Sequence, residues 1–172
     1  MDKLLVVVDM QVDFITGSLG SSEAQRIIPR VVEKVNNALE QKSTVAYTMD
    51  THLEDYLQTL EGQNLPVKHC ICGTDGWELI PELKGLLLEF GQFRKSTFGS
   101  MALIEKFRNE NFVEIELCGV CTDICVVSNA LLLRAVFPNT KIVVDSLATA
   151  GSSIEAHKAA LLVMQKNHIE IL

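Results

Sequence analysis

Short runs of apolar residues, many of them β-branched, recur along the chain and alternate with segments of a different spacing. The first run, Lys3–Val8, has no polar interruption after its lysine, which is typical of a strand buried on both faces of a parallel sheet. Five further segments are predicted to be strands. The predicted strands are Lys3–Val8, Thr44–Met49, Gly91–Lys95, Phe112–Cys118, Lys141–Val144 and Ile169–Leu172.

Between these runs, apolar residues return every three or four positions, which is the spacing of a helix with one buried face. Pro29 suits the first turn of the first such helix, and Ser152 with Glu155 forms the pattern of a capping box at the start of the last. A long irregular stretch runs from Asp50 to about Trp77, and a loop of that length inside a compact domain is usually functional. The predicted helices are Pro29–Lys42, Ser100–Arg108, Thr122–Val136 and Ser152–Asn167.

The alternation of strands and helices predicts a parallel sheet, because right-handed crossovers link each strand to the next. Such crossovers place helices on both faces, so the predicted fold is a three-layer αβα, doubly wound, Rossmann-like α/β domain. The apolar fraction of 48% and the charged fraction of 22% are those of a globular chain, and we expect a single domain over residues 1–172. In such sheets the active site lies beyond the carboxyl ends of the strands.

Charge and cysteine content narrow the possible partners and location. The formal net charge of −7 repels a phosphate backbone, so nucleic acid is not an expected partner. Since no apolar run approaches the length of a membrane span, we expect a soluble protein without a membrane partner. Five cysteines are an odd number in a chain long enough to fold without disulfides, which favours reduced thiols and a cytoplasmic location.

Cys125 is the first candidate for chemistry. It lies shortly after a predicted strand, and either Thr122 or Asp123 is suited to cap the helix that follows. The thiol is therefore expected in the first helical turn, where the helix dipole and free N–H groups favour the nucleophilic thiolate and can bind an oxyanion. The position also fits a small buried hydrophobe, because free cysteine is commonly buried.

The other four cysteines are interpreted as packing or loop residues. Cys118 and Cys121 have the C-x-x-C spacing of a redox pair or of half a zinc site. Redox pairs normally begin a helix, whereas Cys118 ends a predicted strand, and a second pair of cysteines for a zinc site is missing. Cys70 and Cys72 also lack partners in the sequence.

Asp9 and Lys95 each end a predicted strand. Taken alone, the aspartate could form a turn and the lysine could be solvated, and Asp13 and Glu54 are alternative carboxylates. However, Asp9, Lys95 and Cys125 follow or end three strands of one parallel sheet, so all three can meet at one edge. This arrangement predicts catalysis by an activated cysteine.

A second group of side chains has metal-binding chemistry. Asp50 and His52 are two residues apart at the end of a predicted strand, so they point the same way, and Glu61 and His69 lie in the loop that follows. Oxygen and nitrogen ligands without thiolate suit Zn, Mn or Fe(II). The alternative is that Asp50 and His52 cap the loop and that His69 is a surface residue. The two remaining histidines are interpreted as structural.

These residues resemble the motifs of the isochorismatase-like cysteine hydrolases, and within them the nicotinamidase branch, over essentially the whole chain. The resemblance implies that Asp9 is the general base for Cys125 and that Lys95 orients or polarises the pair. It also implies a cis peptide bond between Val120 and Cys121, with an oxyanion hole formed by the amides of Cys121 and Cys125. The matching segments are Val7-Val-Asp-Met-Gln-Val-Asp-Phe14, Phe93-Arg-Lys95 and Gly119-Val-Cys-Thr-Asp-Ile-Cys-Val126.

The resemblance extends to the metal. Asp50-Thr-His52 and His69 look like the metal motif of nicotinamidases, and Glu61 is similar to a carboxylate that serves as an additional ligand in some members. The implied cofactor is a divalent metal, with zinc as the first choice and Mn or Fe as alternatives.

The implied activity is hydrolysis of a small-molecule amide through an acyl-thioester on Cys125, with nicotinamide as the leading candidate and a homo-oligomer as the assembly. Phe14 and Val120 are the implied substrate contacts, and Pro66 stands where metal-binding members carry an aromatic residue that stacks on the pyridine ring. An N-carbamoyl compound or another non-aromatic amide is the alternative substrate. A catalytically silent oligomerising domain and a flavodoxin-like FMN carrier are the alternative functions, which the intact catalytic set and the lack of a phosphate-binding loop disfavour.

Overall fold

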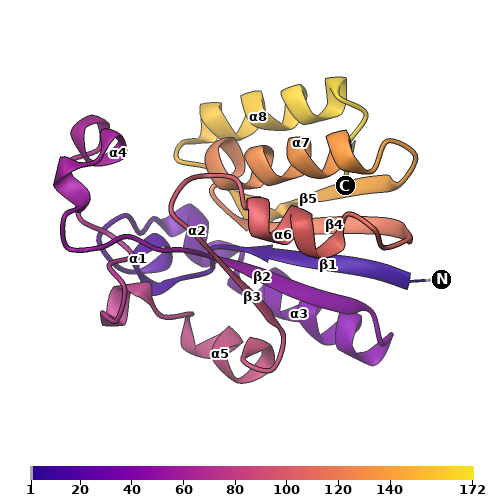
Figure 1. Ribbon diagram of the computed structural model, residues 1–172, viewed down its shortest axis with the longest axis horizontal. Coiled ribbons are helices and arrows are strands. Elements are labelled where there is room, and N and C mark those ends of the chain that lie inside the picture. The colour runs from indigo at the N-terminus through magenta and orange to yellow at the C-terminus, as the bar shows by residue number, and fades with distance from the viewer. Residues whose placement is uncertain (1) are drawn as a thin grey trace.

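The computed structural model describes residues 2–172, which form a six-stranded parallel sheet between two layers of helices (Figure 1). The strand order is β3-β2-β1-β4-β5-β6, so the chain builds outward from β1 in one direction and then in the other. This arrangement confirms the predicted doubly wound α/β fold. The strands are β1 Asp2–Val8, β2 Thr44–Asp50, β3 Gly91–Lys95, β4 Phe112–Val120, β5 Lys141–Ala150 and β6 Glu170–Ile171.

Helices cover both faces of the sheet (Figure 1). Residues of α1, α2, α3 and α5 pack on one face, and residues of α6, α7 and α8 pack on the other. No helix within residues 2–172 combines the length and the apolar character needed to cross a membrane. The helical elements are α1 Val12–Ile15, α2 Ser22–Arg26, α3 Ile28–Glu40, η1 Tyr56–Gln58, α4 Leu60–Asn64, η2 Asp75–Trp77, α5 Pro81–Leu87, α6 Met101–Phe107, η3 Thr122–Val126, α7 Val127–Val136 and α8 Ile154–Lys166.

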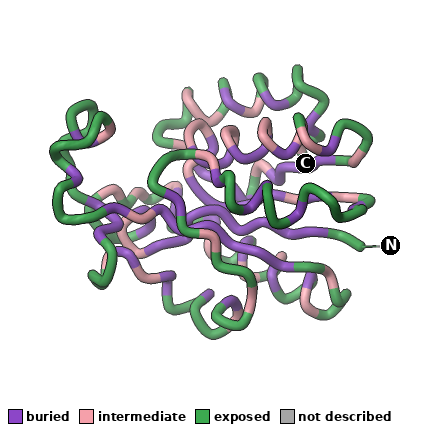
Figure 2. The backbone as a smooth tube through the Cα atoms, in the orientation of Figure 1, coloured by how far each residue is buried: buried purple, intermediate pink, exposed green. Residues whose placement is uncertain are grey.

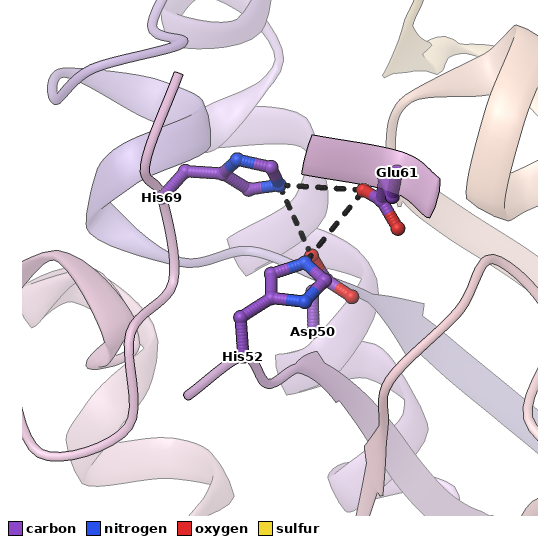
Figure 3. Close-up of side chains that lie close together, drawn as sticks. All are labelled: Asp50, His52, Glu61 and His69. Atoms are coloured by element: carbon purple, nitrogen blue, oxygen red, sulfur yellow. Dashed lines mark ion pairs between the residues drawn. The ribbon is translucent and has the colours of Figure 1, made fainter. Parts of the chain in front are cut away.

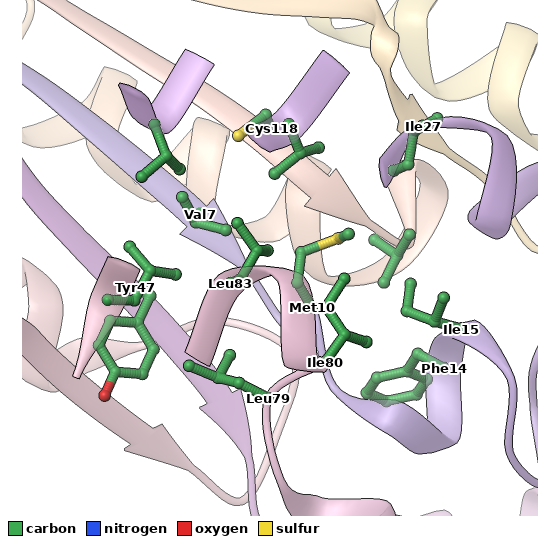
Figure 4. Close-up of a cluster of buried hydrophobic side chains, with 14 of the residues drawn as sticks. Val7, Met10, Phe14, Ile15, Ile27, Tyr47, Leu79, Ile80, Leu83 and Cys118 are labelled. Carbon is green, nitrogen blue, oxygen red and sulfur yellow. The ribbon is translucent and has the colours of Figure 1, made fainter. Parts of the chain in front are cut away.

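Each face of the central strand β1 packs against a different helical layer. Leu5 and Val7 belong to the cluster that includes residues of α3 and α5 (Figure 4). Leu4, Val6 and Val8 belong to the cluster that includes residues of α6, α7 and α8. Because successive side chains of a strand point to opposite faces, a strand covered on both sides is apolar at every position. This explains the uninterrupted apolar run at the start of the sequence.

The structure adds helices that the apolar spacing did not predict. Helix α5 begins at Pro81 and buries Leu83 and Leu87, which is a single repeat of the helical spacing and too short to be recognised as periodic. Helices α1 and α2 are four and five residues long, so they lack even that repeat. All three helices pack on the same face of the sheet as α3.

Helix α8 begins at a different residue from the one predicted. Ser153 is its N-cap, since Ser153 Oγ accepts a hydrogen bond of 3.1 Å from the amide of Ala156. Ser152 instead donates from its hydroxyl and its amide to the carboxylate of Asp123, at 2.6 and 2.8 Å. The predicted capping box of Ser152 with Glu155 is therefore wrong, because a partner far away in the sequence binds Ser152.

Strand β5 continues past its predicted end at Val144. Asp145 interrupts the apolar run in the sequence, but in the structure this carboxylate is buried inside the strand. Lys34 Nζ lies 2.7 Å from Asp145 Oδ2, and Arg30 Nε lies 3.2 Å from the same oxygen. Two cations from α3 thus make a buried charge tolerable at a strand position.

The carboxyl ends of β1 and β4 form the point where the winding of the sheet changes direction, and a crevice is expected there. Asp9 follows β1, and Cys121 follows β4. The strands approach closely, since a Cβ at Gly119 would collide with the carbonyl oxygen of Val8, and Gly119 has a φ of +112°. Glycine alone meets both conditions.

Figure 2 shows that the sheet strands are largely buried, whereas the segment around α4 is mostly exposed.

Candidate active site

The three predicted catalytic residues lie together at the carboxyl edge of the sheet. Asp9 directly follows β1, Lys95 ends β3, and Cys125 lies in the η3 turn after β4. Lys95 Nζ is 2.7 Å from Asp9 Oδ2 and 3.3 Å from Cys125 Sγ. A single ammonium group therefore contacts both the carboxylate and the thiol.

Asp9 is fully buried, and its backbone has a φ of +49° at the point where the chain leaves β1. Thr48 Oγ1 donates a hydrogen bond of 2.7 Å to Asp9 Oδ1, which leaves Oδ2 to face Lys95. Burial raises the pKa of the Asp9 carboxyl group against the opposing charge of Lys95, and the negative charge of Asp50 raises it further. A carboxylate with a raised pKa is a stronger base than an exposed one.

The side chain of Cys125 is also buried. Burial raises the pKa of the thiol well above its usual range, and the charge of Asp9 adds to the rise while Lys95 opposes it. This differs from the predicted stabilisation of the thiolate by a helix N-terminus. Residues 122–126 form a π-helical turn that begins after Cys121, instead of an α-helical turn capped by Thr122 or Asp123. The thiol therefore needs a neighbouring base to lose its proton.

Asn129 connects the Cys125 turn to the segment after β3, and it was missed in the sequence. This fully buried side chain donates from Nδ2 to the carbonyl oxygens of Cys125 and Phe98, at 2.8 and 3.2 Å. Its Oδ1 accepts a hydrogen bond of 2.9 Å from the amide of Ser100. One amide side chain thus forms hydrogen bonds with three backbone groups, and it holds the turn of Cys125 against the segment that follows Lys95. An asparagine in a largely apolar helix was the available signal.

The residues implied as oxyanion donors lie at the start of the η3 turn and within it. The peptide bond between Val120 and Cys121 is cis, as the resemblance implies. Cys121 immediately precedes the η3 turn, and Cys125 lies within it. Two contacts attach α8 to this turn: Asp123 binds Ser152 as described above, and Thr122 Oγ1 lies 2.8 Å from His157 Nδ1.

Four side chains with metal-binding chemistry lie close together (Figure 3), and we call them the metal-ligand group: Asp50, His52, Glu61 and His69. One ligand atom from each residue lies within 4.8 Å of the others. Asp50 Oδ2 is 2.8 Å from His52 Nε2 and 3.4 Å from His69 Nε2. Glu61 Oε1 is 3.6 and 3.7 Å from the same two nitrogens. The other oxygen of Asp50 accepts a hydrogen bond of 3.2 Å from Lys95, so this carboxylate links the two groups.

The metal-ligand group fits a divalent cation. His69 Nδ1 lies 2.8 Å from the carbonyl oxygen of Val67, which can only accept, so Nδ1 carries the proton and Nε2 presents a lone pair to the group. Within residues 2–172, His52 Nε2 is buried without a hydrogen-bond partner, because its short contact to Asp50 lacks hydrogen-bond geometry. A cation between these atoms would satisfy that nitrogen. Two imidazoles and two carboxylates without a thiolate suit Zn, Mn or Fe(II).

Gln11 positions the backbone of Asp50 and was not recognised in the sequence. Its buried amide group donates from Nε2 to the carbonyl oxygens of Asp50 and Trp77, each at 2.8 Å. Its Oε1 accepts a hydrogen bond of 2.8 Å from the amide of Asp50. The side chain therefore ties the end of β2 to the first loop.

Asp13 supports the metal-ligand group from the other side. Its Oδ2 accepts a hydrogen bond of 2.8 Å from the amide of Cys70, the residue after His69. Cys70 has a φ of +46°, so this contact holds an uncommon backbone conformation next to a ligand. Asp13, an alternative catalytic carboxylate in the sequence, thus lies outside the contact between Lys95 and Cys125. Glu54, the other alternative, is exposed and pairs with Lys68 at 3.1 Å.

A cavity of about 810 Å³ joins these groups. Cys125 and the whole metal-ligand group line it, together with Phe14 and Val120, the two implied substrate contacts. The ring of Phe14 lies 5.4 Å from that of His69. Asp9 and Lys95 are buried and do not line the cavity; Lys95 contacts the thiol of Cys125, and Asp9 contacts Lys95. A small ligand in the cavity would therefore meet the thiol at one place and the metal-ligand group at another.

The sequence model of the isochorismatase domain matches residues 3–172. An uncharacterized isochorismatase family protein of Bacillus subtilis is 31% identical over 173 residues, which cover 94% of this chain and 93% of that protein. The nicotinamidase of Schizosaccharomyces pombe is 30% identical over 209 residues, which cover 98% of this chain and 91% of that protein. The crystal structure of the pyrazinamidase of Pyrococcus horikoshii in complex with zinc has a TM-score of 0.87 and 26% identity, and the match covers 100% of this chain and 99% of that one. The chain belongs to the isochorismatase family.

Proposed function

We propose that the protein is a cysteine-dependent amidohydrolase that cleaves the carbon–nitrogen bond of a small-molecule amide, with nicotinamide as the leading candidate. The observation that carries this proposal is the contact of Lys95 Nζ with both Asp9 and Cys125, at the wall of a cavity that also holds the metal-ligand group. A nucleophile, a base and a substrate-holding site thus lie together. The likeness to the nicotinamidase of Schizosaccharomyces pombe supports the same reaction class.

The reaction begins when the thiol of Cys125 transfers its proton to the carboxylate of Asp9. Asp9 accepts it readily, because burial has raised the pKa of the carboxyl group. Lys95 stays charged: burial would lower its pKa, but the negative charges of Asp9, the Cys125 thiolate and Asp50 outweigh burial and raise it. The ammonium group therefore stabilises the thiolate as it forms.

The thiolate then attacks the amide carbonyl carbon, and the carbonyl electron pair moves to the oxygen. The backbone amides of Cys121 and Cys125 stabilise this oxyanion. When the tetrahedral intermediate collapses, Asp9 gives its proton to the departing nitrogen and the carbon–nitrogen bond breaks. Ammonia leaves, and the acyl group remains on Cys125 as a thioester.

Water completes the cycle. Asp9, now ionised again, takes a proton from a water molecule while the water oxygen attacks the thioester carbonyl. The carbon–sulfur bond breaks, the carboxylic acid is released, and Asp9 returns its proton to the sulfur of Cys125. The net change is one amide and one water converted to one acid and one ammonia, with both residues restored.

The metal-ligand group would hold a divalent ion, proposed as zinc with Mn or Fe(II) as alternatives. Bound there, the ion supplies a Lewis-acid contact for a polar group of the substrate, such as the ring nitrogen of nicotinamide. Phe14 and Val120 provide apolar walls for the ring. The zinc in the pyrazinamidase structure from Pyrococcus horikoshii supports the choice of metal.

Ammonia release from nicotinamide tests the proposal, with protein that has been stripped by a chelator and then reloaded with Zn or Mn. We expect release to require the metal and to disappear in Cys125→Ala. Cys72→Ala is the matched control, because Cys72 is an exposed cysteine outside the cavity lining. Mass spectrometry during turnover should find an acyl group on Cys125.

Full activity of Cys125→Ala would overturn the thioester mechanism. If the metal-loaded protein releases no ammonia from nicotinamide, assays with N-carbamoyl compounds and other non-aromatic amides decide between the substrates. The proposal also includes a homo-oligomeric assembly and a cytoplasmic location, which sedimentation velocity and cell fractionation test. Five free cysteines support a reducing compartment.

A further inference from the structure

The cavity is larger than a single pyridine amide needs. Its volume of about 810 Å³ falls in the range of sites that enclose drug-sized ligands, roughly 300–1,000 Å³. Because the cavity is this large, one six-membered ring with a carboxamide group, placed between Cys125 and the metal-ligand group, would leave part of the volume free. The remaining space opens toward solvent and is available to a substituent on the ring.

Large apolar side chains surround the mouth of this space. They are exposed to solvent, whereas Cys125 and His52 in the inner part are buried. The exposed fraction is 76% for Leu60, which is high for a leucine that lines a concave site. We call these residues the apolar rim: Leu53, Leu60, Leu65 and Phe98.

The rim comes from two segments that are distant in the sequence. Leu53, Leu60 and Leu65 belong to the connection that contains α4, and Phe98 follows β3. Polar residues of the same connection, Asp55 among them, line the cavity as well. Apolar surface gathered around a concave opening is favourable only when something apolar covers it.

The occupant that fits best is a substrate rather than a second protein surface. The rim and Cys125 line one continuous cavity, so a ligand that contacts the rim can also reach the thiol. A second copy seated on the rim would close the mouth of the same cavity and obstruct access to the thiol. We infer that the preferred substrate is an aromatic carboxamide that carries an apolar substituent, which the rim covers while Cys125 attacks the amide. This inference rests on the proposed amidohydrolase function.

The test compares nicotinamide with nicotinamides that carry a phenyl group or a carboxylate at ring carbon 5 or 6. For the zinc-loaded protein we expect kcat/KM for the best phenyl derivative to exceed that for nicotinamide by about ten-fold, because the added ring buries apolar area. The carboxylate derivatives should show no such gain. Calorimetric titration of the same compounds into Cys125→Ala measures the preference in binding, without turnover.

Two leucines of one connection provide matched variants. Leu60→Ser removes part of the rim and should lower the phenyl-to-nicotinamide ratio of kcat/KM by about three- to ten-fold. Leu57→Ser alters a leucine that is also exposed but lies outside the cavity lining, and it should leave that ratio and the nicotinamide rate unchanged. Equal effects of the two variants would contradict the inference.

The remaining outcomes separate the inference from the proposed function. If the protein cleaves nicotinamide but binds and cleaves every phenyl derivative less well, the inference is wrong and the proposed function stands. If no amide is cleaved but Cys125→Ala prefers phenyl derivatives, the proposed function fails and the ligand class is still supported. If Leu60→Ser dissociates an oligomer in sedimentation and leaves the ratio unchanged, the rim is an interface between copies and the inference is wrong.

Discussion

Asp9 and Asp145 are both buried carboxylates beside a lysine, yet their pKa values shift in opposite directions. Around Asp9, burial raises the pKa, and the one lysine in contact does not offset it. That lysine, Lys95, also contacts Asp50 and Cys125, so its charge is shared among three groups that can be anionic. Around Lys95, groups that can carry a negative charge therefore outnumber the single ammonium group.

Asp145 has the opposite surroundings. Burial would raise its pKa, but the lysine Lys34, the amide of Leu147 and the guanidinium of Arg30 together lower it. These donors contact its two oxygens at 2.7, 2.8 and 3.2 Å. A carboxylate with several donors stays ionised and stabilises the fold, whereas one that shares a single cation is ready to accept a proton. The comparison thus separates a structural acid from a candidate base.

The largest expected effect comes from removing the central lysine of each region. In Lys95→Met we expect kcat/KM for amide hydrolysis to fall by about 10²–10⁴-fold, because the Cys125 thiolate loses its neighbouring charge. In Lys34→Met we expect a lower free energy of unfolding and an unchanged kcat/KM. Steady-state kinetics and thermal unfolding of both variants measure the two effects. Wild-type activity in Lys95→Met would show that Lys95 is not needed for catalysis, and Asp9 and Asp145 would then not differ in function through their lysines.

A second test reaches the carboxyl edge through its supporting residues. Asp13→Ala removes the acceptor for the amide of Cys70, the residue after His69, so His69 is held less firmly and we expect zinc affinity to fall by about 10-fold, the lower end of the loss seen when an outer contact of a metal site is removed. Competition with a chromogenic chelator measures the affinity. Glu54→Ala, which alters an exposed ion pair, should leave it unchanged. Unchanged zinc binding in Asp13→Ala would show that the loop keeps His69 in place without this contact.

Part of this site could be predicted because strand ends in a parallel sheet meet at one edge. Asp9, Lys95 and Cys125 each follow or end a strand, so topology alone brought them together. The state of the thiol could not be predicted in the same way. A helix N-terminus suggested a lowered pKa for Cys125, but burial and the charge of Asp9 raise it, and both depend on packing between distant segments.

The errors in the fold have the same physical origin. Ser152 matched a capping box within its own segment, but Asp123 binds it from 29 positions earlier in the sequence. The predicted strand ended at Val144, before the charged Asp145, yet β5 continues because Arg30 binds this carboxylate from 115 positions earlier. Local spacing predicts local structure, and it carries no information on which distant partner a polar side chain will meet.

A smaller effect is expected when Asp145 itself is replaced. Asp145→Asn keeps the size of the side chain and removes its charge, so Lys34 and Arg30 lose a buried partner. We expect the free energy of unfolding at neutral pH to fall by about 1–3 kcal/mol, with kcat/KM unchanged. Urea denaturation measures it. The matched control is Glu33→Gln, because Glu33 is an exposed partner of the same arginine and should contribute almost nothing.

The smallest expected effect is the change with pH in the stability lost by Asp145→Asn, and it tests the contrast between Asp145 and Asp9. The folded pKa of Asp145 is lowered below its unfolded value of about 3.9, so its stabilising charge is fully present above that pH and is lost as the pH falls through the folded pKa. The facing groups Lys34 and Arg30 keep their charge throughout this range, and the other carboxylates that contact them, Glu116 and Glu33, are left unchanged by the substitution. We therefore expect the unfolding free energies of the wild type and of Asp145→Asn to differ by a constant amount from about pH 7 to 5 and to converge below about pH 4. A difference that persists undiminished in acid would mean that Asp145 stabilises β5 through its shape and neutral hydrogen bonds, and the contrast with Asp9 would then rest on geometry instead of charge.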